Sequence, residues 1–172
     1  MRVILLYREK KIAWYVAKLR DEGEWTRSNT NRKNHNMNTR VLHYIGCLGE
    51  MAFAKGMDKY WSGAGRGAED DDDVGGLQVR VTRHLNGRLP IYLEDDDNKP
   101  FFLLIGEKGE YRVAGWAFAY EAKHDKYWKK LRPDKPAAWY YPQHLLRPLT
   151  DLTYETPPAR FSNGSSWIRT QN

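Results

Sequence analysis

Four polar residues in the middle of the chain are spaced so that they could act at one point: Glu50, Asp73, Gln78 and Arg80. Apolar and polar residues alternate from position 77 to 82, which predicts a strand with Gln78 and Arg80 on one face. Asp73 stands just before that strand, so its carboxylate and the two polar side chains can converge at the strand entrance. The charge pattern of the chain indicates what chemistry such a group would perform.

Acidic residues are concentrated in the centre of the chain. Residues 61–110 contain 11 acidic and 6 basic side chains. Basic side chains dominate on either side, with 12 basic and 6 acidic over 1–60 and 8 basic and 3 acidic over 111–150. An acidic centre between basic segments suits a metal-dependent enzyme acting on a polyanion, because carboxylates hold the cation and basic side chains hold phosphates. A solvated surface with unevenly distributed charge gives the same counts, so this alternative stays open.

Two helices are predicted ahead of the strand. Apolar residues recur at helical spacing over 3–20, which Gly23 helps to end, and over 39–57, which carries Glu50 among apolar neighbours. A basic, Asn-rich loop over 24–38 separates them, and a loop that is first Gly-rich and then acidic follows over 61–72.

Short strands dominate the second half of the chain. Asn86-Gly87 is a strong hairpin signal. The continuous apolar run at 101–105 predicts a central strand buried on both faces, and 137–141 reads as an edge strand. Further strands are predicted over 89–93 and 111–116. The fold class is therefore α/β or α+β, with two N-terminal helices packed on a mixed, mainly antiparallel sheet. We expect one domain over 1–150 and a weakly ordered tail over 151–172.

Composition excludes several classes of protein. The single cysteine, Cys47, excludes a disulfide scaffold and a cysteine-based zinc site. No apolar run approaches the roughly 20 residues of a membrane-spanning helix, and the first ten residues lack a signal peptide's features. These features predict a cytoplasmic protein that does not bind membranes.

The order of the polar residues resembles the PD-(D/E)xK superfamily of restriction-endonuclease-like nucleases. Glu50 would be the helix carboxylate, and Asp73-Val74-Gly75-Gly76-Leu77-Gln78-Val79-Arg80 would be the main motif, with Gln-x-Arg in place of Glu-x-Lys. The strands that follow, the last ending in Gly115-Trp116, also resemble phage and prophage members, so the resemblance spans roughly residues 40–120. It implies a restriction-endonuclease-like core and Mg²⁺- or Mn²⁺-dependent hydrolysis of DNA, by a phage-encoded protein in the cytoplasm of a bacterial host.

The resemblance also implies a role for each residue. Asp73 would bridge the metal, Glu50 would bind it directly or through water, and Gln78 would supply an amide oxygen. Arg80 would contact the scissile phosphate. Because Gln78 is neutral, the site should hold a cation more weakly than a carboxylate pair does. Because arginine keeps its proton, Arg80 cannot act as a general base.

Basic residues on both sides of the acidic centre are candidates for DNA contacts. The first group surrounds the Asn-rich loop, and the second is interleaved with Tyr127 and Trp128, aromatic residues that either stack on bases or anchor the segment to the core. The candidates are Arg27, Arg32, Lys33, Arg40, Lys126, Lys129 and Lys130. A homodimer is possible, because cleavage of a duplex requires two active sites.

Each feature also has a purely structural interpretation. Glu50 could be a surface charge of a helix, Asp73 the end of a solvated acidic loop, and Gln78 with Arg80 the polar face of a half-exposed strand. Two alternative functions therefore remain: a catalytically inactive nucleic-acid-binding protein on the same fold, and a phage protein that binds a host protein.

Overall fold

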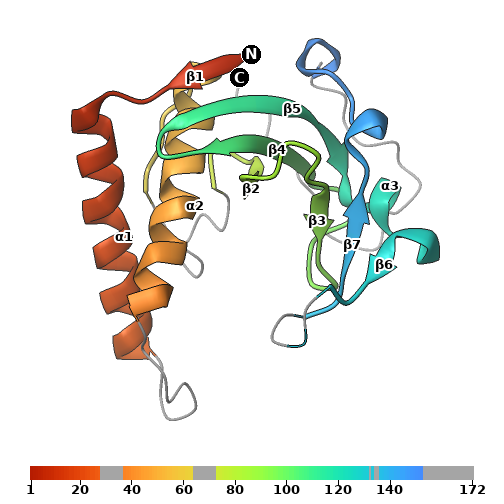
Figure 1. Cartoon of the computed structure of the whole chain (residues 1–172), viewed down its shortest axis with the longest axis horizontal. Coiled ribbons are helices and arrows are strands. Elements are labelled where there is room, and N and C mark those ends of the chain that lie inside the picture. Colours follow the sequence, from red (N-terminus) through yellow and green to blue (C-terminus); the bar gives the residue numbers. More distant parts are fainter. Residues whose placement is uncertain (28–36, 64–72, 132, 134–135, 153–172) are drawn as a thin grey trace, which may run out of the picture.

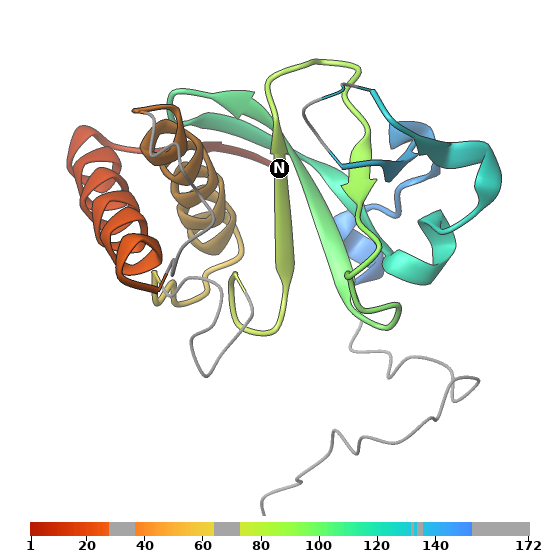
Figure 2. The ribbon, with the colours of Figure 1, turned by 90° about the horizontal axis from the view of Figure 1, so that it is seen from below.

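The computed structural model describes residues 1–27, 37–63, 73–131, 133 and 136–152, without the side chains of 22–27 and 37–39. The chain forms three layers (Figures 1 and 2). Two long helices cover one face of a four-stranded sheet, and a three-stranded sheet with a short helix packs on the other face. The mixed α+β class expected from the sequence is confirmed.

The helical layer consists of α1 (Tyr7–Arg27) and α2 (Met37–Gly56). Ala13 and Ala17 are fully buried one helical turn apart, and these small side chains allow the two helices to approach closely. The prediction for 39–57 is confirmed by α2. The predicted start and end of the first helix are wrong: residues Arg2–Ile4 form strand β1, which pairs with β5, and the helix continues through Gly23.

The central sheet has the strand order β1-β5-β4-β2. Strands β4 (Pro100–Glu107) and β5 (Glu110–Phe118) are antiparallel, whereas β2 (Gln78–Thr82) runs parallel to β4. Strand β4 is buried on both faces, because its alternate side chains contribute to two separate apolar cores, one beneath the helices and one beneath the second sheet. The prediction of a central buried strand is confirmed.

The second sheet has the order β3-β7-β6, formed by β3 (Leu89–Ile91), β7 (Ala138–Tyr141) and β6 (Trp128–Lys129). The predicted hairpin at Asn86-Gly87 is wrong, although a turn forms there. After the turn the apolar side chains of β3 are buried in the second core, and β3 pairs with β7 instead of β2. Strand β7 is central in its sheet, which corrects the prediction of an edge strand.

Short helices complete the fold: α3 (Ala119–Ala122) and the 3₁₀ turns Asp125–Tyr127, Gln143–Leu145 and Leu149–Asp151. Leu152 packs against the first core. Of the predicted tail, residues 153–172 lie outside the described residues. Within the described ranges, no helix has the length and apolar character needed to cross a membrane.

Contact between α2 and β2 predicts opposite effects for two glycines of the same helix. A methyl group added at Gly49 would overlap the Cγ2 methyl of Val81, whose branched side chain has few rotamers. We expect Gly49→Ala to lower the free energy of unfolding by about 1–3 kcal/mol. At Gly46 the nearest atom to an added methyl group would be Glu50 Oε1 at 3.7 Å, an ordinary contact. Because glycine is unfavourable inside a helix, Gly46→Ala should raise the free energy of unfolding by about 0.5–1 kcal/mol.

Urea denaturation of the two variants measures both effects. Gly46→Ala is the matched control, because it makes the same chemical change one turn earlier in α2. Equal effects of the two substitutions would contradict the close contact between Gly49 and Val81.

Candidate functional site

Glu50 lies between the two helices and not on a solvent-facing surface. It is 6% exposed, and both of its carboxylate oxygens are bound by Arg20 of α1, at 2.9 Å from Nη1 to Oε1 and 2.6 Å from Nη2 to Oε2. The indole N–H of Trp61 donates a third hydrogen bond to Oε2 at 3.0 Å. The same guanidinium donates through Nε to the carbonyl oxygen of Gly63. The interpretation of Glu50 as a surface charge is therefore wrong.

Asp73 lies at the entrance of β2, as its position in the sequence predicts. Its Oδ2 accepts a hydrogen bond of 2.7 Å from the backbone N–H of Val79, which fixes the carboxylate against the first residues of the strand. Burial and then the negative charge of Glu50 raise the pKa of Asp73 to about 6, although the Val79 N–H and the charges of Arg80 and Arg20 act to lower it. The two carboxylates are thus close enough to repel each other.

Arg80 is held inside the protein by an ion pair that the sequence analysis did not identify. Its Nη2 lies 2.9 Å from Oδ1 of Asp95, whose side chain is only 7% exposed. The guanidinium carbon lies 5.0 Å from the ring centre of Phe101 and 5.7 Å from that of Tyr92, within the range of cation–π attraction. The buried Nε of Arg80 finds no hydrogen-bond acceptor among the residues that the structure describes.

The residues of the candidate site lie on both faces of strand β2. Val79 and Val81 pack in the core beneath the helices, so Gln78 and Arg80 point to the opposite face. Asp73 precedes the strand, where its carboxylate is influenced by Glu50 from the helical side and by Arg80 from the other side. The structure therefore brings Glu50, Asp73 and the charge of Arg80 together, with Gln78 half-buried on the face of Arg80.

The donor set is suited to a hard divalent cation. Each carboxylate oxygen accepts two hydrogen bonds or ligands, so Glu50 Oε1 has one acceptor position that Arg20, Trp61 and the other described residues do not fill. Two carboxylates are oxygen ligands of the kind that Mg²⁺ takes up together with water and phosphate, whereas the Gln78 amide points to the face of β2 opposite to Glu50. In the described part of the chain no three His, Cys, Asp or Glu residues gather into a metal-binding group, so a cation here would need water as well.

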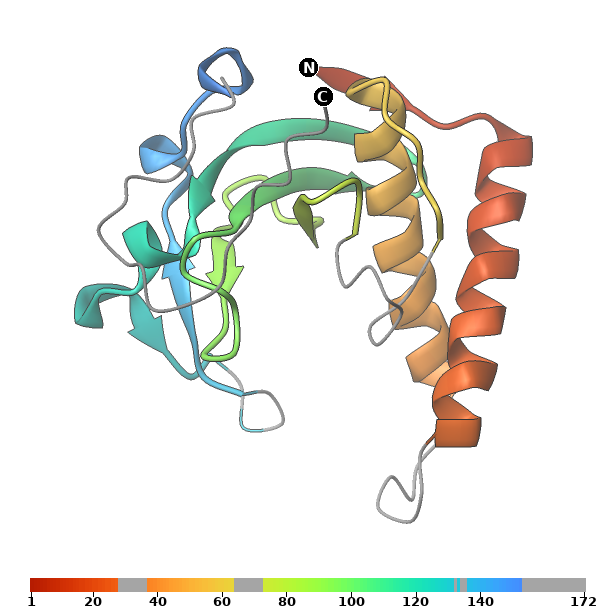
Figure 3. The ribbon, with the colours of Figure 1, turned by 180° about the vertical axis from the view of Figure 1, so that it is seen from behind.

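The candidate DNA-binding residues fall on opposite sides of the fold. Lys126, Lys129 and Lys130 are exposed in or next to β6, whereas Arg40 belongs to α2, and the central sheet lies between these two elements (Figures 1 and 3). Arg40 is paired with Asp21 at 3.1 Å. Arg32 and Lys33 lie outside the described residues, as does the side chain of Arg27.

The aromatic residues of the second basic group differ in their surroundings. Tyr127 is buried in the second core, where the ammonium of Lys126 lies 4.8 Å from its ring centre. Trp128 is 41% exposed and contacts Trp139 with the two ring centres 4.4 Å apart. Tyr127 therefore anchors the segment, and Trp128 retains an accessible surface.

Three residues of the site carried no sequence signal. Arg20 and Trp61 reach Glu50 from positions 30 and 11 residues away, and Asp95 lies in a run of acidic residues that does not by itself indicate a buried partner. In the structure the Asp95 carboxylate points inward and accepts a hydrogen bond of 2.8 Å from the backbone N–H of Tyr92. Such partners depend on how the layers pack, and no local pattern encodes that packing.

Comparison with known proteins reveals no relative: no protein-family model, curated protein or solved structure matches the chain.

The raised pKa of Asp73 predicts a pH-dependent effect of Asp73→Asn. A carboxyl group whose pKa rises on folding, here from 3.8 to about 6, binds its proton more tightly in the folded state. Ionised Asp73 therefore costs stability as the pH rises through this interval. Relative to the wild type, Asp73→Asn should gain up to about 3 kcal/mol in free energy of unfolding between pH 4 and pH 7.5.

Chemical denaturation in EDTA at a series of pH values measures this difference. Asp58→Asn is the control, because Asp58 is exposed and its φ of 51° is one that asparagine tolerates. Over the same pH range Asp73→Asn should gain more stability relative to the wild type than this control does. If the advantage of Asp73→Asn shrinks as the pH rises, the proposed environment of Asp73 is wrong.

Proposed function

We propose that this protein is a metal-dependent nuclease that hydrolyses phosphodiester bonds of DNA, with Asp73 as the central metal ligand. The proposal is carried by the half-buried carboxylate of Asp73 at the entrance of β2, whose pKa is raised by burial and by the negative charge of the buried Glu50. Buried carboxylates with neighbouring like charge are typical of sites that bind cations, because a cation removes the repulsion. The restriction-endonuclease-like character of the core belongs to the same proposal.

Asp73 and Glu50 would hold Mg²⁺ or Mn²⁺ together with water, because Gln78 points to the face of β2 opposite to the helices that carry Glu50. When bound, the ion would lower the pKa of a coordinated water and stabilise charge developing on the phosphate. Arg20 fixes the orientation of the Glu50 carboxylate through two hydrogen bonds, so that this oxygen ligand is held in place before a metal arrives. Arg80 supplies positive charge beside Asp73, and its Nε is a donor for a phosphate oxygen if the side chain moves.

Positive charge elsewhere on the chain would attract the DNA. The exposed Lys126, Lys129 and Lys130 would contact phosphates, and the accessible face of Trp128 would stack on a base. The proposal includes a phage-encoded protein in the bacterial cytoplasm, and a homodimer when both strands of a duplex are cut.

A second function, DNA binding without catalysis, is favoured by one observation. The groups that would contact substrate are already engaged: Arg20 and Trp61 occupy three acceptor positions of Glu50, and Asp95 binds the guanidinium of Arg80. A protein that had lost its activity could retain such contacts as structural links between the layers.

Metal-dependent cleavage separates the two functions. Wild type, Asp73→Asn and the exposed control Asp58→Asn would be incubated with supercoiled, linear and branched DNA in Mg²⁺, Mn²⁺ or EDTA. We expect the wild type and the control to cleave at equal rates, EDTA to stop both, and Asp73→Asn to be at least about a hundredfold slower. In the same buffers Mg²⁺ should raise the melting temperature of the wild type but not that of Asp73→Asn.

Other results would reject the proposal. Cleavage that survives Asp73→Asn would place the active site elsewhere. Absence of cleavage, with DNA bound equally by all three proteins and more weakly at higher salt, would identify the non-catalytic DNA-binding function. If none of the proteins cleaves or binds DNA, a protein-binding function becomes the better account.

A further inference from the structure

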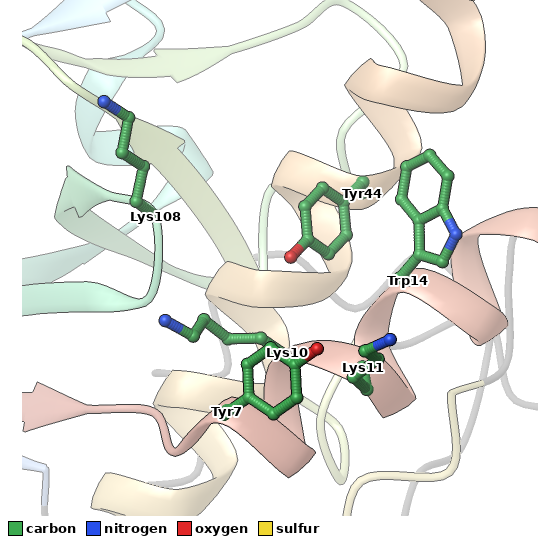
Figure 4. A pocket seen from close by; sticks show the side chains of 6 residues that line it. All are labelled: Tyr7, Lys10, Lys11, Trp14, Tyr44 and Lys108. Carbon is green, nitrogen blue, oxygen red and sulfur yellow. The ribbon is translucent and has the colours of Figure 1, made fainter.

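A second polar region lies on the other side of the seam between α1 and α2. A pocket of about 420 Å³ opens there, where the helices meet the turn between β4 and β5 (Figure 4). Trp14 and Arg20 are six residues apart in α1, which places them about 120° apart around the helix, so the pocket is separate from the Glu50 site. It is lined by Tyr7, Lys10, Lys11, Trp14, Tyr44 and Lys108.

Positive charge in this pocket is concentrated and has no acidic counterpart among the lining side chains. Three ammonium groups come from two parts of the chain, Lys10 and Lys11 from α1 and Lys108 from the turn. Of the acidic neighbours, Glu9 is directed away, since its carboxylate binds Lys55 at 2.8 Å. Glu107 precedes Lys108 in the chain and is exposed outside the lining. Three like charges around one cavity repel each other, and an anion bound between them would remove the repulsion.

The lysines are held in place by the backbone around them. Lys108 has a φ of 56°, a left-handed conformation that turns the chain toward α1. The alkyl chain of Lys10 packs on Gly109, where a methyl group would approach Lys10 Cδ to 2.8 Å. This contact places the Lys10 side chain beside the turn that carries Lys108, and the three ammonium groups stand at different points around the pocket (Figure 4).

Aromatic rings form the rest of the pocket wall. Trp14 and Tyr44 meet edge to face with ring centres 5.2 Å apart, which fixes the indole between the helices while leaving it 43% exposed. Tyr7 is 71% exposed, and Lys11 lies 5.4 Å from its ring centre. Exposed flat rings beside clustered ammonium groups match a ligand with a planar ring and a phosphate. The pocket volume is in the range of small-molecule sites.

We propose that this pocket binds a nucleotide, with the base stacked on Trp14 or Tyr7 and the phosphates held by Lys10, Lys11 and Lys108. Stacking on aromatic rings accepts any base, and lysine binds phosphate as a point charge. The ligand can be a free nucleotide or the phosphorylated end of a nucleic-acid strand, since both present the same groups. This site is independent of the nuclease function proposed above, because it shares none of its residues.

Calorimetric titration of the full chain tests the site. ATP, adenosine and tripolyphosphate would be titrated separately in EDTA, so that no cation can bind phosphate at Asp73. We expect saturable binding of one ATP per chain, and we expect adenosine and tripolyphosphate each to bind at least tenfold more weakly than ATP. Trp14→Leu should weaken ATP binding about tenfold, and Lys10→Gln combined with Lys108→Gln should weaken it further and reduce its salt dependence. Asp73→Asn should bind ATP as the wild type does.

Two controls on the outward face of the same helix match these changes. Tyr15→Ala removes an aromatic ring that is 61% exposed, and Arg8→Gln removes an exposed positive charge, both outside the pocket. Neither should change ATP affinity, and melting curves would show that each variant is folded.

The proposal is overturned if ATP does not bind, if tripolyphosphate binds as tightly as ATP, or if Trp14→Leu has no more effect than Tyr15→Ala. A 5′-phosphorylated oligonucleotide, added as a competitor in EDTA, distinguishes the two forms of the ligand. If the oligonucleotide displaces ATP at a lower concentration than AMP does, the ligand is a strand end. If AMP displaces ATP at the lower concentration, the ligand is a free nucleotide.

Discussion

The buried ion pair between Arg20 and Glu50 is the interaction on which the rest of the site depends. It joins α1 to α2 at the depth of the core, and the same guanidinium also binds the Gly63 carbonyl, so the chain segment that leaves α2 is tied to the helices. Removing charged groups from water is costly, and only a geometry with several hydrogen bonds offsets that cost. Loss of either partner would leave a buried charge unpaired beside Asp73, whose ionisation already responds to both.

Helix α1 contributes to two polar regions because the fully buried side chains in its described part form a narrow stripe of small residues. Ala13 and Ala17 form the contact with α2, and the residues on either side of this stripe flank the seam. On one flank Arg20 reaches Glu50; on the other Trp14 contacts Tyr44. One helical hairpin therefore supports both the candidate metal site and the basic aromatic pocket, and the two proposals share a preference for phosphate-bearing ligands.

Strand β2 has a different role on each face. Toward the helices it presents valines to the first core, and Gly49 allows α2 to lie directly on Val81. Toward the second sheet it presents Arg80, which lies near Phe101 and Tyr92 and binds Asp95. An arginine in such surroundings links two layers, so any role in binding phosphate would require it to exchange Asp95 for the substrate.

Much of the fold could be read from local patterns. The apolar run at 101–105 predicts a strand buried on both faces, because no polar residue interrupts it, and β4 has that arrangement. The helical stripe over 39–57 and the strand after Asp73 are likewise present. The pairing of strands was harder to predict from the sequence. Asn86-Gly87 correctly predicts a turn, but this local signal does not determine which strand pairs with β3. The pairing of β3 with β7 follows from the burial of the β3 side chains in the second core.

The sequence by itself determined the class of the fold, the central strand, and the position of Asp73 at a strand entrance, since each depends on neighbouring residues and their period. Only the tertiary structure decided the partners of the site residues: Arg20 and Trp61 for Glu50, and Asp95 for Arg80. It also assembled the pocket from α1, α2 and a turn about a hundred residues from α1. The physical reason is that burial and charge pairing act between segments that packing brings together, and their separation along the chain carries no signal.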